Sequence, residues 1–301
     1  YISHRMEEIF TICDRITVLR DGKQVLVTNI SDTSMNEIIE IMIGRKAGNA
    51  MEWKKREVDR SSDPILELEE VCSGRRVQGV SLRLYPGEIL GIAGLLGSGR
   101  TELLQSIFGI RPIDGGTVKL RGQPVNIRTP KQAINAGMAL IPEDRRKQGL
   151  VLDHSVRDNM LLPTLHRWIS KGFVNDRRGK DAVAAYIGEL AIKTDHMDKT
   201  IRFLSGGNQQ KVVMAKWLMS QPDILLLDEP TVGIDISSKM EIMETIRRLA
   251  DEGKAVLFVS SELAELLAIS DRVLILKKGK SINMLHRHEI ESEEVLHHAI
   301  Q

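Results

Sequence analysis

The sequence predicts an α/β fold with a central parallel sheet covered on both faces. Four short, nearly continuous apolar runs support this prediction: EILGIAG, MALIP, DILLLDE and AVLFVS, at residues 88–94, 138–142, 223–229 and 255–260. Each run is followed by sequence of helical period, as expected for doubly buried parallel strands. The alternating segments ILELEEV, VSLRLY and TVKLRG predict a second, antiparallel layer. Residues 156–200 are mostly helical in period and lack strand runs, so we expect a helical insertion there.

The length, composition and charge limit the classes of protein to which the chain can belong. The length of 301 residues allows one large α/β domain or two small ones, and 42% apolar residues are enough for a packed core. A balance of 42 basic against 41 acidic residues gives no reason to expect the strongly basic face that nucleic-acid binding usually needs. No apolar run reaches the length of about 18 residues that a transmembrane helix needs. Cys13 and Cys72 form no C-x-x-C unit, which favours a reducing, cytosolic setting.

A segment at the beginning of the chain recurs near its end. YISHRMEEIFTICDRITVLRDGK (residues 1–23) aligns without a gap with FVSSELAELLAISDRVLILKKGK (residues 258–280), and eight positions are identical. A repeat at this spacing predicts two copies of one domain. We therefore expect the chain to begin inside the last strand of a first copy. Residues 1–30 are the predicted remnant of that copy, 31–64 a helical and charged linker, and 65–301 a complete second copy, with its helical part at about 150–220.

The stretch GLLGSGRTE at residues 94–102 follows an apolar run and opens a predicted helix. It fits the phosphate-loop pattern G-x-x-x-x-G-K-[ST], except that an arginine replaces the lysine. The backbone N–H groups of such a turn and the helix dipole attract phosphate. The candidate nucleotide-binding residues are Gly94, Leu95, Leu96, Gly97, Ser98, Gly99, Arg100, Thr101 and Glu102.

Two carboxylates end the run DILLLDE. In phosphate-loop ATPases, an aspartate at this place holds Mg²⁺, and the glutamate after it orients or deprotonates the attacking water. The loop and the two acids are both predicted at the carboxyl ends of strands, where α/β proteins bind ligands. The sequence therefore predicts an ATP site in which Thr101 and Asp228 hold Mg²⁺ and Glu229 is catalytic.

A third motif, LSGGNQQKVVMAKWL, begins at residue 204. Its serine is a predicted helix N-cap, and the following glycine pair, which normally costs helix stability, indicates close approach by a ligand or another chain segment. The motif resembles the signature of ATP-binding-cassette (ABC) ATPases, with Asn208 where glutamine is commoner. The residues that carry this resemblance are Leu204, Ser205, Gly206, Gly207, Asn208 and Gln209, and GIDISS resembles the D-loop of the family around Asp235.

Residues 65–301 are similar to that family in the order of their motifs. The resemblance implies a P-loop NTPase fold, the ABC cassette, with a RecA-like core, an antiparallel β subdomain and a helical subdomain. It also implies that two cassettes pack head to tail, so that each ATP lies between the phosphate loop of one and the signature of the other.

The second copy departs from the family at several positions. By the register of the repeat, the switch histidine of the family is His4 in the first copy but Ser261 in the second. Glu143 falls where the family has its Q-loop glutamine, and Arg100 replaces the loop lysine with a bulkier, forked cation. The stretch EEVCSGRRVQG has no aromatic residue to stack on adenine. Together these departures predict a site that holds nucleotide and hydrolyses it poorly, while the signature of this copy completes the site of the first.

The combination of two cassettes, the loop arginine, IPEDRRKQGLV and LSGGNQQK is similar to the ATP-binding subunits of bacterial monosaccharide importers. This resemblance implies a peripheral protein on the cytoplasmic face of the inner membrane. Its expected partners are the first cassette, a permease pair and, indirectly, a periplasmic sugar-binding protein. The sequence does not identify the solute.

Two alternatives remain open at this point. One is a double-cassette ATPase that acts on ribosomes or nucleic acid, although the expected linker is short and mixed in charge. The other is a scaffold cassette that binds no nucleotide and supplies only its signature.

Overall fold

The computed structural model describes residues 1–2, 6–20, 22–43, 53, 55–170, 173–174, 176–290 and 292–301. Its central feature is a six-stranded sheet in the order β14-β13-β5-β12-β11-β8. Five strands run parallel, and β14 is antiparallel to β13. The strands are β5 (Ile89–Ala93), β8 (Met138–Ile141), β11 (Ile224–Asp228), β12 (Ala255–Val259), β13 (Arg272–Lys277) and β14 (Lys280–His286).

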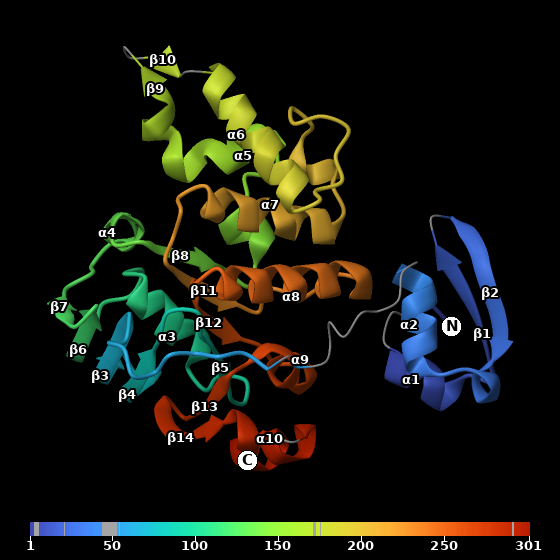
Figure 1. The fold of residues 1–301 in the computed structure, drawn as a ribbon, viewed down its shortest axis with the longest axis horizontal. Coiled ribbons are helices and arrows are strands. Elements are labelled where there is room, and N and C mark those ends of the chain that lie inside the picture. Colours follow the sequence, from blue (N-terminus) through green and yellow to red (C-terminus); the bar gives the residue numbers. More distant parts are fainter. Residues whose placement is uncertain are drawn as a thin grey trace.

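Both faces of this sheet are buried. Successive side chains of a strand point to opposite faces, so each strand contributes to the apolar packing on both sides. Along β5, Ile89 and Ala93 belong to one apolar cluster, and Leu90 and Ile92 belong to another. The first cluster contains side chains of α7 (Gly206–Leu218), α8 (Ile236–Asp251), α9 (Leu263–Ile269) and α10 (Glu293–Ile300). The second contains side chains of α3 (Arg100–Ile107) and α4 (Pro130–Asn135). The apolar runs of the sequence therefore correspond to the doubly covered strands of a layered α/β core (Figure 1).

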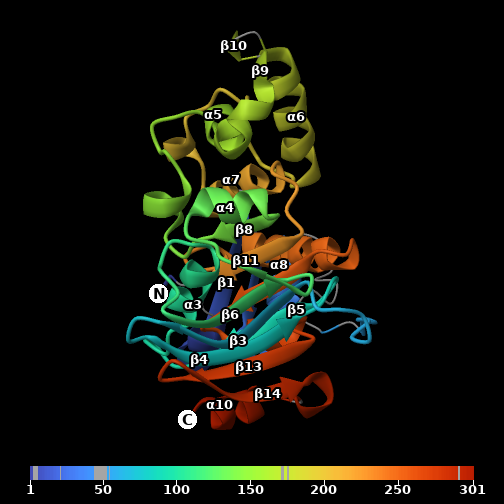
Figure 2. The ribbon, with the colours of Figure 1, turned by 90° about the vertical axis from the view of Figure 1, so that its left-hand side faces the viewer.

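An antiparallel sheet of four strands covers the α3 side, in the order β4-β3-β6-β7 (Figure 2). Its strands are β3 (Leu66–Ser73), β4 (Val77–Leu84), β6 (Gly115–Leu120) and β7 (Gln123–Val125). Leu66 and Leu68 of β3 are fully buried, whereas the intervening Glu67 is only partly covered. This is the alternation that the sequence predicted for a sheet with one buried face.

A helical lobe stands above the sheet in Figure 1, beyond α7. It contains α5 (Val156–Leu161), η3 (Leu162–Trp168), α6 (Asp176–Glu189) and η4 (Ile201–Phe203). The expectation that this region lacks strands was wrong in one detail, since β9 (Ile169–Ser170) pairs with β10 (Phe173–Val174). Strands of two residues are too short to show a period in the sequence. None of the described helices combines the length and the apolar character needed to cross a bilayer.

The described residues from Met6 to Ile43 form a small unit that repeats the end of the chain. It contains α1 (Met6–Ile12), β1 (Arg15–Arg20), β2 (Lys23–Asn29), η1 (Ile30–Asp32) and α2 (Met35–Ile43). At the offset of the sequence repeat these correspond to α9, β13, β14, η5 (Arg287–Glu289) and α10. Both hairpins also change register at equivalent places, at Val18/Leu19 and at Ile275/Leu276. The sequence repeat is therefore also a structural repeat.

The expected strand at the beginning of the chain is not formed at its two described residues. Tyr1 and Ile2 are exposed and outside any strand, whereas their counterparts Phe258 and Val259 lie in β12. A strand needs a neighbour to satisfy its backbone hydrogen bonds, and β12 has two, β5 and β11. His4 lies outside the described residues.

The segment before β3 lies against the core. Arg56 donates hydrogen bonds to the carbonyl oxygens of Gly87 (2.6 Å) and Arg247 (3.1 Å). Its guanidinium is also paired with Asp251 (3.1 Å) and Asp271 (3.6 Å). Because Arg56 is almost fully covered, the end of the predicted linker is held in a defined position.

Candidate functional site

The glycine-rich turn connects β5 to α3 and depends on glycines for its path. Gly97 and Gly99 have φ values of +78° and +102°, which residues with a side chain rarely adopt. A Cβ atom on Gly99 would lie 2.1 Å from the carbonyl oxygen of Arg76. The turn therefore passes so close to the β3–β4 connection that no side chain fits. It leads into the first turn of α3, where free backbone N–H groups favour an anion.

The turn and the acidic strand end come together at one edge of the sheet. The Thr101 hydroxyl donates a hydrogen bond of 3.2 Å to Oδ1 of Asp228. Thr101 lies in the first turn of α3 after β5, and Asp228 ends β11, which is separated from β5 only by β12. These strands are parallel, so their carboxyl ends lie on the same side. This is the geometry of a phosphate and metal site at the carboxyl edge of an α/β sheet.

Burial dominates the electrostatics of the two carboxylates. The pKa of Asp228 is raised to about 6, chiefly by burial; nearby Glu143 and Glu229 contribute to the rise, and the hydrogen bond from Thr101 and the charge of Arg100 oppose it. Burial likewise raises the pKa of Glu229, opposed by hydrogen bonds from Ser261 and by Arg100. A hydroxyl and a desolvated carboxylate are oxygen donors of the kind that Mg²⁺ prefers. The residues present therefore fit this ion.

Arg100 is turned into the protein. Its side chain is 9% exposed, and Nη1 donates a hydrogen bond of 3.0 Å to the carbonyl oxygen of Ser260. Nη2 lies 3.6 Å from Oε1 of Glu229. Ser261 contacts the other carboxylate oxygen of Glu229, through its backbone N at 2.9 Å and its hydroxyl at 3.1 Å. The arginine and serine that depart from the family pattern thus meet at the same carboxylate.

The signature segment starts α7, and Ser205 caps it as predicted. The Ser205 hydroxyl accepts hydrogen bonds from the backbone N of Asn208 (3.4 Å) and from its side-chain amide (2.9 Å). A Cβ on Gly207 would lie 2.0 Å from Oγ of Ser238. The glycine pair predicted a close approach by a ligand or another chain segment. At Gly207 that segment is α8 of the same chain. Gln209 points inward and donates to the carbonyl oxygens of Ile201 and Leu204, whereas Ser205 is exposed.

Asp235 caps α8 beside this signature. Its carboxylate accepts hydrogen bonds from the backbone N (2.9 Å) and the hydroxyl (2.8 Å) of Ser238, the residue that crowds Gly207. The predicted D-loop and the predicted signature therefore meet through Ser238. The phosphate loop has other contacts, to Arg76, Asp228 and Glu229.

Comparison with known proteins settles the family. A family model described as ABC transporter matches residues 77–232, slightly more than half of the chain. The chain belongs to the ABC transporter family. It is 45% identical over 296 residues to the ribose import ATP-binding protein RbsA of Geobacillus kaustophilus, which covers 98% of this chain and 59% of that protein. It is 42% identical over 303 residues to a putative ribose/galactose/methyl galactoside import ATP-binding protein of Burkholderia cenocepacia. That match covers 100% of this chain and 59% of the relative, so the chain spans about three fifths of the length of these curated relatives.

Solved cassettes share the fold. A nucleotide-free ATP-binding cassette from an ABC transporter superposes with a TM-score of 0.66 at 22% identity, covering 78% of this chain and 95% of that one. A dimeric, post-hydrolysis cassette bound to ADP and Pi gives a TM-score of 0.63 at 20% identity, covering 74% and 98%. The predicted ABC cassette fold is confirmed.

Two positioning residues of this ABC cassette were missed from the sequence. Arg145 starts the π-helical turn η2 (Arg145–Gly149), which begins two residues after Glu143. It donates through Nη1 to the carbonyl oxygen of Val232 (2.8 Å) and through Nη2 to that of Gly233 (3.0 Å). It thereby connects the segment of Glu143 to the loop that leads to Asp235. The arginine was visible in IPEDRRKQG, but its partners, almost 90 residues later, were not.

The second missed residue, Glu265 of α9, is fully buried behind the cassette's acidic pair. It accepts hydrogen bonds from the hydroxyls of Thr231 and Ser260, both at 2.7 Å, and lies 2.9 Å from Nζ of Lys239. Ser260 precedes Ser261, and Thr231 follows the acidic pair by two residues. The signal for Glu265 was its identity with Glu8 in the repeat.

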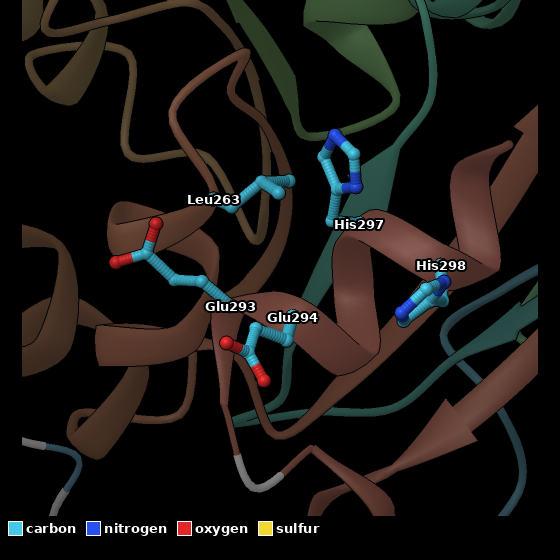
Figure 3. A pocket seen from close by; sticks show the side chains of 5 residues that line it. All are labelled: Leu263, Glu293, Glu294, His297 and His298. Atoms are coloured by element: carbon cyan, nitrogen blue, oxygen red, sulfur yellow. The ribbon is translucent and has the colours of Figure 1, made fainter.

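A surface pocket between α9 and α10 does not belong to this site. It is lined by Leu263, Glu293, Glu294, His297 and His298. Figure 3 shows that their side chains point in different directions rather than toward one centre. Among the described residues no group of three or more His, Cys, Asp or Glu side chains is arranged to hold a metal ion.

Proposed function

We propose that this chain is part of the ATP-binding subunit of an ABC importer for a monosaccharide. The bond between Thr101 and Asp228 carries the proposal, because it joins the phosphate loop to the acidic strand end. The names of the relatives support the substrate class, since they describe import ATP-binding proteins for ribose and related sugars. Such a subunit would act at the cytoplasmic face of the membrane, with a permease pair and a sugar-binding protein as partners.

The residues of the proposed ATP site have separate roles. Backbone N–H groups between Gly97 and Thr101 would hold the phosphates, and Thr101 and Asp228 would hold Mg²⁺. Bound Mg²⁺ would neutralise charge on the phosphates. The Glu229 carboxylate would act as the general base that accepts a proton from the attacking water.

The proposed site is degenerate. The Nη1 and Nη2 groups of Arg100 contact the Ser260 carbonyl oxygen and the Glu229 carboxylate instead of pointing toward the phosphate loop's ligand. Ser261 has no imidazole with which to reach a phosphate. Glu143 adds negative charge near Asp228. We therefore expect this cassette to retain ATP and to hydrolyse it slowly. Its exposed Ser205 would complete a second ATP site, whose phosphate loop belongs to a first cassette that precedes residue 1 in the proposed whole protein.

The proposal is tested by titrating the chain with a fluorescent ATP analogue and Mg²⁺, and by measuring phosphate release. We expect saturable binding, with turnover below about 0.1 per second against a median of about 10 per second for enzymes. Gly99→Ala should weaken binding at least about tenfold, because its Cβ would lie 2.1 Å from the Arg76 carbonyl oxygen.

Gly122→Ala is the matched control. Gly122 also has a positive φ, +75°, but an added Cβ would meet nothing within 4 Å. This variant should bind as the parent chain does. Absence of binding in the parent would favour a scaffold cassette, and turnover at the rate of an ordinary enzyme would contradict the degenerate site.

A further inference from the structure

Both carboxylate oxygens of Glu229 are already occupied by groups of its own cassette. Oε1 lies 3.6 Å from Nη2 of Arg100, and Oε2 accepts from the backbone N (2.9 Å) and the hydroxyl (3.1 Å) of Ser261. The Glu229 side chain is 7% exposed. A general base must have an oxygen free to accept a proton from water within hydrogen-bond reach. In this arrangement Oε2 already accepts two hydrogen bonds, and Oε1 faces the Arg100 guanidinium at ion-pair distance.

The two groups that hold Glu229 are connected to each other. Arg100 is anchored through Nη1 to the carbonyl oxygen of Ser260, the residue before Ser261. The Ser260 hydroxyl is in turn fixed by Glu265 at 2.7 Å. Only a forked guanidinium can contact the Ser260 carbonyl and the Glu229 carboxylate through separate nitrogens, because a lysine has a single compact ammonium.

The backbone restrains Glu229 as well. Its φ is +48°, a conformation that is uncommon for residues other than glycine. Its N–H is bonded to the Val259 carbonyl oxygen at 3.0 Å, so the residue is tied to β12, the strand that precedes Ser260 and Ser261. Reorientation of the carboxylate therefore has to break the contacts with Arg100 and Ser261.

We propose that Arg100 and Ser261 form a clamp that holds Glu229 against its own cassette and suppresses ATP hydrolysis. Both are positioning residues that act through Glu229. The inference rests on the proposed function, namely that this cassette binds ATP, and goes beyond it. ATP hydrolysis is slow because the Glu229 carboxylate is restrained, so substitutions that remove its contacts with Arg100 or Ser261 raise the hydrolysis rate.

The test uses Arg100→Lys, Ser261→Ala and the double variant, with ATP affinity and turnover at saturating ATP measured separately. Arg100→Lys keeps the positive charge and removes the fork, so we expect turnover to rise about tenfold with ATP affinity changed less than about threefold. Ser261→Ala removes one of two donors to Oε2 and should raise turnover about threefold. The double variant should exceed both, within the range of roughly 10²–10⁴ that a general base contributes.

Two controls accompany these variants. Glu229→Gln in the double-variant background should return turnover to the parent level, because the gain depends on that carboxylate. Arg111→Lys is the matched exchange outside the site, where the arginine contacts Gln105, and should change neither quantity. Equal turnover in the parent and the double variant, at unchanged ATP affinity, would overturn the clamp.

A measurement without nucleotide separates the clamp from the proposed function. Unfolding in urea of Arg100→Met, Glu229→Gln and the double variant forms a cycle. The clamp predicts that the change in the unfolding constant of the double variant differs at least about fivefold from the product of the single changes. Additive changes, within about twofold, would overturn the clamp even if ATP binds. Failure to bind ATP with a coupled cycle would overturn the proposed function, and with it the suppression of hydrolysis, and would leave only a structural contact between Arg100 and Glu229.

Discussion

Asp228 combines burial with a negative charge. Its side chain is nearly inaccessible, and the contacts that stabilise its carboxylate, from Thr101 and Arg100, do not offset the loss of water. Burial of a carboxyl group without full compensation favours the protonated form. The residue therefore costs stability whenever it is ionised and no cation is bound, which is expected of a group kept for binding rather than for folding.

This cost predicts how stability depends on pH. The pKa of Asp228 is about 6 in the folded protein, against 3.8 as the ordinary value, so its favourable contribution is complete below about pH 4 and is lost as the pH rises through 6. Without Mg²⁺, Asp228→Asn should be more stable than the parent at pH 8 by up to about 3 kcal/mol, and the difference should vanish near pH 4. Urea unfolding in EDTA across this range measures it.

Asp158 serves as the control of opposite sign. Hydrogen bonds from Ser155 lower its pKa, so it stabilises the fold above about pH 4, and Asp158→Asn should be less stable than the parent at neutral pH. An Asp228→Asn variant that loses stability at pH 8 in the same way would contradict our account of the buried carboxylate.

At the scale of elements, α7 and α8 approach each other closely at Gly207. A Cβ on Gly207 would lie 2.0 Å from Oγ and 2.3 Å from Cβ of Ser238. No rotation of the Ser238 side chain removes the second contact. The glycine therefore sets the distance between the signature helix and the helix that Asp235 caps.

Gly207→Ala should lower the free energy of unfolding by about 2 kcal/mol, because overpacking a core typically costs 1–3 kcal/mol. Addition of Ser238→Gly removes both contacts, so the double variant should be more stable than the sum of the single changes allows. Gly188→Ala in α6 is the matched control, since a Cβ there meets nothing within 4 Å, and it should be neutral or slightly stabilising. Thermal unfolding of the parent chain, the two single variants, the double variant and the Gly188→Ala control measures these effects, and additive effects of the two single changes would argue against the contact.

The sequence predicted the elements that carry strong local signals. The apolar runs located β5, β8, β11 and β12, since doubly buried strands have a recognisable composition. It could not predict the short β9–β10 pair or the π-helical turn at Arg145, because their hydrogen bonds leave no periodic pattern. Nor could it predict the direction of Arg100, which depends on Ser260 and Glu229, both more than 120 residues away. The motifs that supply the candidate site residues could be found from local sequence, whereas the contacts among these residues depend on the tertiary fold.

At the scale of the whole molecule, the two copies of the repeat differ in how far other elements bury their apolar side chains. β13 is buried on both faces because its side chains alternate between the two apolar clusters of the core, whereas in β1 buried residues alternate with exposed ones. Leu19 of β1 is 67% exposed, and its counterpart Leu276 is 1% exposed. Ile12 and Ile269 differ in the same way. Apolar side chains that are exposed in the first copy are therefore buried by other elements of the cassette in the second copy. In our proposal, the rest of the first cassette buries them in the whole protein.

This difference yields a prediction for a matched pair of leucines. In the chain of 301 residues, Leu276→Ala should cost about 2–5 kcal/mol, the usual range for a buried leucine, and Leu19→Ala should cost less than about 0.5 kcal/mol. In the longer protein that we propose, an apolar cluster equivalent to the one that buries Leu276 would cover Leu19, and the two substitutions should become similarly costly. Urea unfolding of both variants in both chains measures this. If Leu19→Ala remained without effect in the longer protein, the first 43 residues would not be the end of a cassette, because the surface they expose would have no cover to lose.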